Sequence, residues 1–228
     1  RKPLPPGPDE LYDLGYRIMV KILGVVDPGR NIGLDRISLS RVEQEGMDQS
    51  RALLLEAAAQ GHMRAQEVCG ELYRWGMGVP KDDRLAFVYT EKAAHQGEIR
   101  TQHNIGVFYA EGRGCEQSLE RAAEWWDKAA RQGDPRAMAS LGWLYHNGLG
   151  VPQSFTRGFE LFQQSRDMGN TSNTLHWELG ACYEHGKGVA KDYMEAQRFY
   201  KLASAQGHAD ATYALNRLDA KIRTECPL

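Results

Sequence analysis

The sequence has no excess of charge of either sign and no long apolar run. Its 228 residues include 28 lysines and arginines against 30 aspartates and glutamates, a formal net charge of -2. Nothing in this composition supports the broad attraction to phosphate backbones that nucleic-acid binding requires. The best apolar stretch, 18–26, is short and is interrupted by Lys21, whereas a membrane-spanning helix needs roughly 18 apolar residues or more. We therefore expect neither nucleic-acid binding nor membrane insertion.

The spacings typical of metal and nucleophile sites are also missing. The four cysteines form no C-x-x-C pair, and the sequence contains neither H-E-x-x-H nor Ser-x-x-Lys. No position of the repeat described below carries a histidine in every unit, which disfavours a repeated metal site. We therefore expect no metal, no cofactor and no small-molecule substrate, and we interpret the chain as a non-enzyme.

Glycine, in contrast, recurs at a fixed period. Similar phrases end in Gly61, Gly97, Gly133, Gly169 and Gly207, at intervals of 36, 36, 36 and 38 residues. A period of roughly 20–50 residues is typical of stacked supersecondary units. The pattern predicts one elongated array with four full repeats. These repeats span 62–97, 98–133, 134–169 and 170–207.

Each repeat has the same internal order. A glycine lies within the first apolar segment, at Gly70, Gly106, Gly142 and Gly180, and a tyrosine follows three residues later. Because glycine inside a helix costs ~1 kcal/mol relative to alanine, we expect close packing of a neighbouring helix at this position. A G-x-G turn then ends the segment. An N-cap residue precedes the second helix, at Asp82, Ser118, Ser154 and Asp192. The order predicts a helix-turn-helix hairpin.

Several segments resemble a known repeat family. LGWLYHNGLGVPQ, AAEWWDKAARQG and AQRFYKLASAQG are similar to Sel-one-like repeats, relatives of the tetratricopeptide repeat, and the resemblance extends over about residues 48–218. It implies an all-α fold, a right-handed α-solenoid of helix-turn-helix repeats. It also implies that the first helices line a concave face and that the protein holds other proteins together.

The ends of the chain depart from the repeat. Residues 1–9 are rich in proline and are predicted to form an extended arm. Residues 10–61 are predicted to be a degenerate N-terminal repeat with a long loop over 24–47. The final segment, 208–228, is predicted to be a capping helix, at about 209–223, followed by a tail.

Three cysteines occupy apolar positions of the repeat, which predicts buried free thiols: Cys69, Cys115 and Cys182. No two cysteines fall in the within-repeat pairing that the resemblance associates with the secreted, disulfide-rich branch of the family. We therefore expect a reducing intracellular compartment, either the cytoplasm or the mitochondrial matrix.

The first helices also carry positions that vary between repeats and lie opposite the core at helical spacing. Tryptophan and arginine, two residue types enriched in interface hot spots, are found there. The candidate partner-binding residues are Arg64, Trp75, Arg100, His103, Arg136, Trp143, His146, Trp177 and His185. The alternative is a solvated face whose tryptophans shield the next repeat.

These patterns predict a non-catalytic scaffold or adaptor that binds a partner peptide or helix in its concave groove. One alternative is an accessory subunit built permanently into a large multiprotein complex, for example a mitochondrial one. Another is a hydrolase of the penicillin-binding type, which the resemblance to the secreted branch suggests but which the missing Ser-x-x-Lys disfavours.

Overall fold

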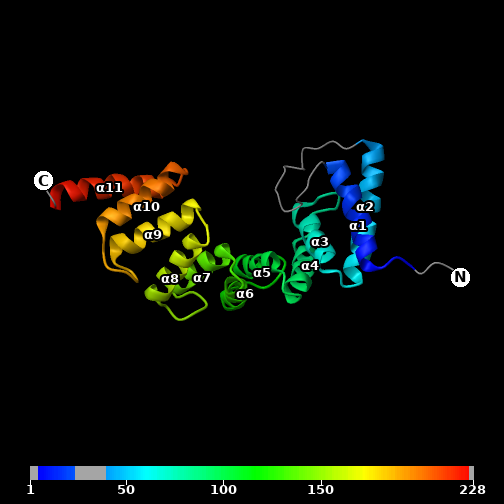
Figure 1. Ribbon diagram of the computed structural model, residues 1–228, viewed down its shortest axis with the longest axis horizontal. Helices are drawn as coiled ribbons and strands as arrows, with labels where there is room; N and C mark the ends of the chain where they lie inside the picture. The colour runs from blue at the N-terminus through cyan, green and yellow to red at the C-terminus, as the bar shows by residue number, and fades with distance from the viewer. Residues whose placement is uncertain (1–4, 24–39, 226–228) are drawn as a thin grey trace. The chain divides into compact units, whose positions relative to one another are not determined.

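The computed structural model describes residues 5–23 and 40–225. Within these ranges every regular element is an α-helix, and the helices are numbered α1 to α11 in chain order (Figure 1). The predicted all-α fold of helix-turn-helix repeats is confirmed. The chain divides into two compact units, residues 1–117 and 118–228, and each unit is described by itself.

The first unit pairs its described helices in sequence order. They are α1 (Pro8–Leu23), α2 (Arg41–Ala59), α3 (Met63–Trp75), α4 (Asp83–His95) and α5 (Ile99–Glu111). Helix α1 packs on α2, α3 packs on α4, and α4 also packs on α5. Leu11, Met47, Leu54 and Cys69 belong to one buried cluster, so the degenerate N-terminal hairpin shares its core with the first full repeat.

The second unit continues the same pairing. Its helices are α6 (Leu119–Arg131), α7 (Pro135–Asn147), α8 (Phe155–Asp167), α9 (Asn173–His185), α10 (Tyr193–Ala205) and α11 (Ala209–Glu225). Helix α7 packs on α8, α9 packs on α10, and α11 covers α10. Phe162 and Leu179 lie in one buried cluster, and Tyr200 and Leu218 lie in the next.

The predicted helix ends are confirmed. Backbone N–H groups of the first turn donate to the N-cap side chains of Asp82, Ser118, Ser154 and Asp192. The first glycine of each G-x-G turn caps the first helix with φ between 65° and 68°. The periodic glycines that follow the second helices have φ between 82° and 94°. Both sets of glycines have a left-handed backbone conformation, which glycine adopts more readily than other residues.

The second glycine of the G-x-G turn lies where consecutive repeats meet. A Cβ atom on Gly114 would lie 2.1 Å from the carbonyl oxygen of Asp83, at the start of α4. A Cβ atom on Gly188 would lie 2.1 Å from the carbonyl oxygen of Phe155, at the start of α8. The turn therefore passes directly over the N-terminus of the preceding repeat's second helix, and any side chain would hold the two apart.

The glycines inside the first helices have the expected packing role, although side chains contribute most of the contact. A Cβ atom on Gly180 would lie 2.6 Å from the ring of Tyr200, and one on Gly142 would lie 2.9 Å from the ring of Phe162. Because glycine has no side chain, the aromatic ring on the second helix packs directly on the backbone of the first helix.

Two predicted boundaries at the N-terminal end need correction. The loop predicted over 24–47 is too long, because α2 already begins at Arg41 and Ser40 caps it in a reciprocal pair with Glu43. Residues 24–39 lie outside the described residues. The first turns of α2 are exposed up to Met47, so they lack the apolar period by which a packed helix is recognised. Of the predicted arm, Pro8 already begins α1, and residues 1–4 lie outside the described residues.

Candidate functional site

Part of the candidate partner-binding surface holds neighbouring repeats together. The Nε of Arg100 on α5 donates to Glu67 on α3 at 2.7 Å. In the second unit Arg217 on α11 donates to Glu184 on α9, with the same spacing of 33 residues. The Glu184 carboxylate also accepts the hydroxyl hydrogen bond of Tyr200 at 2.8 Å. These charged bonds join consecutive repeats.

The two other candidate arginines have different surroundings. Arg64 is exposed on α3. Burial raises the pKa of Tyr12 on α1, and the positive charge of Arg64 acts in the opposite direction. Arg136, at the start of α7, lies 2.8 Å from the buried carboxylate of Asp134, which is the N-cap of that helix. Arg100 and Arg136 are therefore each paired with a carboxylate inside the chain, and the candidate arginines do not form a row of unpaired cations.

His146 does not belong to an accessible surface, which corrects its assignment as a partner-binding residue. Its ring is buried, lies edge-on to Phe155 with centroids 5.1 Å apart, and places Nδ1 3.7 Å from the Sγ of Cys182. Burial lowers the pKa of His146, and the charges of Lys187 and His185 act in the same direction. The neighbouring repeat covers His146, so it is a core residue. Its lowered pKa favours the neutral imidazole.

The remaining candidate histidines stay on the first helices. His103 is half-buried on α5. His185 is exposed at the end of α9, with its Nε2 3.9 Å from the carboxylate of Glu184.

The three candidate tryptophans differ in their contacts. Trp75 is 43% exposed, and its indole N–H donates to Glu71 at 2.6 Å. Trp177 is half-buried and stacks on His208, the residue before α11, with ring centroids 5.1 Å apart. Trp177 thus shields the next repeat, which is the alternative that the sequence left open. Trp143 on α7 is 41% exposed.

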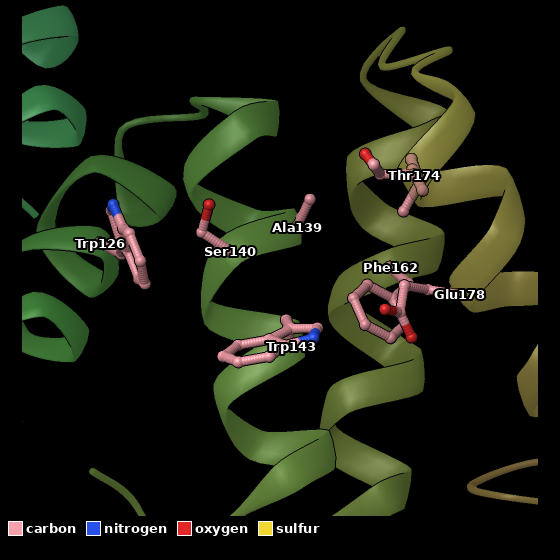
Figure 2. Close-up of a pocket in the computed structure, with 8 residues that line it drawn as sticks. Trp126, Ala139, Ser140, Trp143, Phe162, Thr174 and Glu178 are labelled. Carbon is pink, nitrogen blue, oxygen red and sulfur yellow. The ribbon is translucent and has the colours of Figure 1, made fainter. Parts of the chain in front are cut away.

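Trp143 lines a pocket of about 300 Å³ in the second unit (Figure 2). The other lining residues are Trp126 of α6, Ala139 and Ser140 of α7, Phe162 of α8, and Thr174, Leu175 and Glu178 of α9. Figure 2 shows Trp126 on one side of the α7 residues, with Phe162, Thr174 and Glu178 on the other. The pocket lies between α7 and α9, the first helices of two consecutive repeats.

The size of the side chains explains why the pocket exists. Phe162 sits against Gly142, which leaves its ring close to the backbone of α7. The residues of α7 that line the pocket beside Trp143 are small, Ala139 and Ser140, so they do not fill the space in front of α9. The repeat before has the larger His103 and Asn104 at the corresponding positions. The pocket is therefore a feature of this repeat pair.

Glu178 is the ionisable residue of the lining. Burial raises the pKa of its carboxyl, and the positive charge of Lys187 acts in the opposite direction. Within 5–23 and 40–225, this carboxylate receives no hydrogen bond and forms no ion pair. The pocket thus places largely aromatic walls beside a half-buried carboxylate that has no partner of its own in the described part of the chain.

The described residues hold no group of three or more His, Cys, Asp or Glu side chains that could bind a metal ion. Burial raises the pKa of the Cys69 and Cys182 thiols to about 12, so neither is a thiolate near neutral pH. Cys115 is half-buried. Among the described helices none is long and apolar enough to cross a membrane.

Sequence reasoning found Trp143 but missed most of the lining. Trp126 and Phe162 share a second-helix position, 20 residues after the packing glycine, that was not among the candidate positions. Glu178 follows Val68, Asn104 and Ser140 in the first-helix column. The change to an acid in that column was the available signal.

The fold is that of a helical-repeat protein with a pocket in its second unit. A family model for the Sel1 repeat matches residues 42–62, 64–98, 99–134, 135–170 and 176–208. The chain therefore belongs to the Sel1 repeat family, as its resemblance predicted. Repeats of this family typically act as protein-interaction scaffolds, and their fold is generally non-catalytic.

Solved structures agree with this assignment. A protective antigen of uropathogenic Escherichia coli with an SLR fold is 26% identical, with a TM-score of 0.71 over 92% of this chain. This chain covers only 41% of that protein's length. A Sel1 repeat protein from Oxalobacter formigenes is 25% identical, with a TM-score of 0.71, over 92% of this chain and 75% of its own. No curated protein matches the chain.

Proposed function

We propose that this protein is a non-catalytic scaffold that binds a peptide or helix of a partner protein at the pocket around Trp143. The observation that carries the proposal is the pocket itself, which combines an exposed tryptophan with the rings of Trp126 and Phe162. A large aromatic side chain in a concave site is typical of the residues that dominate binding energy at protein interfaces. The family assignment supports the same class of function.

The dimensions of the pocket favour a side chain of a larger ligand. A volume of about 300 Å³ lies at the lower end of the range found for small-molecule sites. The pocket is also open to solvent along Trp143, so a ligand can continue beyond it over the surface. One or two side chains of a bound segment would fill it.

The repeat that forms one wall is held in place by its own bonds. Glu184 on α9 joins Tyr200 of α10 and Arg217 of α11, so the helix that carries Glu178 is tied to the two helices after it. A site on a rigid element loses little conformational freedom on binding, which favours affinity. The pocket therefore does not depend on a loop for its shape.

The test is a selection of displayed random peptides on the full chain, followed by affinity measurements with two variants. Trp143→Ala should weaken the selected peptides by at least tenfold, because a hot-spot tryptophan is worth about 2 kcal/mol or more. Tyr213→Ala is the control and should leave the affinities unchanged, since Tyr213 is an exposed aromatic residue of α11 that lies outside the pocket. Equal affinity for wild type and a folded Trp143→Ala variant would refute the proposal.

A further inference from the structure

The pocket around Trp143 has the chemistry of a site for a cation. We infer that the partner segment inserts an arginine side chain into it, an inference that rests on the proposed function. Two features of the lining carry it: a carboxylate without a hydrogen-bond or ion-pair partner among the described residues, and an aromatic ring without a cation over it among those residues.

The carboxylate belongs to Glu178. It is half-buried in the lining and has no hydrogen-bond or ion-pair partner in the described part of the chain. The positive charge of Lys187 lowers the pKa of Glu178 against the larger effect of burial, but the Lys187 ammonium lies over the ring of Phe155, 5.1 Å from the centroid. A partly desolvated carboxylate is stabilised by an incoming cation that also donates hydrogen bonds. A guanidinium does both.

The aromatic surface is that of Trp143. Other aromatic rings of this protein are already covered by its own cations: Arg74 lies over Trp75 at 4.9 Å, and Lys128 lies over Trp125 at 4.0 Å. Trp143 has no such cation among the described residues, although it is 41% exposed. Because cations bind favourably to the face of tryptophan, its ring offers an unused position.

Arginine fits the lining better than lysine does. Its guanidinium is planar, stacks on aromatic rings and carries five N–H donors. The lining supplies further acceptors for them, since it includes the hydroxyls of Ser140 and Thr174 as well as the Glu178 carboxylate. An ammonium has three donors and no flat face, so it would use fewer of these contacts.

The experiment starts from a selected peptide whose binding depends on Trp143. Each of its arginines is replaced in turn by citrulline, which keeps the shape but removes the charge, and the peptides are titrated against wild type and Glu178→Gln. At one position, citrulline should weaken binding to wild type by tenfold or more. Glu178→Gln should weaken the arginine peptide similarly and should bind the citrulline peptide within about twofold of wild type.

Glu160→Gln is the matched control, because Glu160 is a half-exposed carboxylate on α8 that pairs with Arg157 outside the pocket. It should leave both affinities unchanged. If Trp143-dependent peptides contain no arginine, or if Glu178→Gln binds them as wild type does, the arginine inference is wrong while the proposed function stands. If no peptide depends on Trp143, the proposed function itself fails.

Discussion

A glycine at the contact between two repeats should matter far more than one at an open turn. Gly188 and Gly207 make a matched pair in the second unit, with φ of 78° and 82°. A Cβ atom at Gly188 would lie 2.1 Å from the carbonyl oxygen of Phe155, whereas one at Gly207 would meet nothing within 4 Å. Alanine at either position has the same backbone strain, so the difference isolates the clash.

The expected loss of folding free energy follows from the backbone strain and from the clash. A left-handed alanine costs about 1–2 kcal/mol, and its lower entropy in the unfolded chain returns about 0.4–1 kcal/mol. Gly207→Ala should therefore destabilise the protein by about 1 kcal/mol. Gly188→Ala has the same loss and adds an overpacking cost of about 1–3 kcal/mol, because the obstructing atom is backbone and cannot rotate away. Its total should reach about 2–4 kcal/mol.

Urea denaturation followed by circular dichroism provides the measurement. Since small proteins lose roughly 1–3 kcal/mol of stability per molar urea, the midpoint of Gly188→Ala should fall below that of Gly207→Ala by roughly 1 M. Both variants should keep their helical content without urea. Equal midpoints would refute the claim that the second turn glycine is required by contact between repeats.

Two further predictions concern helix ends and buried thiols. Asp192→Ala should lower the free energy of unfolding by about 0.5–2 kcal/mol in the same assay, because the Asp192 carboxylate accepts from the N–H groups of Met194 and Glu195; an unchanged midpoint would contradict this capping role. Burial raises the pKa of the Cys69 and Cys182 thiols from 9.0 to about 12. Because the folded state favours the protonated thiol, these groups contribute their full stability below pH about 9, and that contribution is lost as the pH rises towards 12. Urea midpoints should fall over that range, and less steeply when both cysteines are alanine; identical slopes would show that the thiols are not responsible.

Local structure could be predicted because the signals that produce it are local. Asp82 and Asp192 precede their helices and cap them, and the first glycine of each turn ends a helix with a positive φ. Both effects depend on a few adjacent residues, so they repeat wherever the residues do. The same logic failed for the start of α2, where exposed residues precede Met47 and no apolar period marks the helix.

The candidate site was predicted only in part, because the residues of a helix that do not face the core can still be covered by a neighbouring helix. Trp143, Trp177 and His146 all lie on first helices, and the period alone could not separate them. The next repeat decides the outcome: His208, which directly precedes α11, stacks on Trp177, and the core between α7, α8 and α9 encloses His146. Trp143 stays exposed because its neighbours Ala139 and Ser140 are small.

The sequence by itself thus determined the repeat, its helices, their caps and the membership of the Sel1 repeat family, since all of these follow from residue types at fixed spacing. Tertiary structure alone decided which arginines are paired, which tryptophans stay exposed, and that Glu178 has no hydrogen-bond or ion-pair partner in the described part of the chain. The physical reason is that pairing and burial depend on side chains about 33–38 positions away, as in Glu67 with Arg100 and Cys182 with His146. Such contacts exist only after the repeats stack.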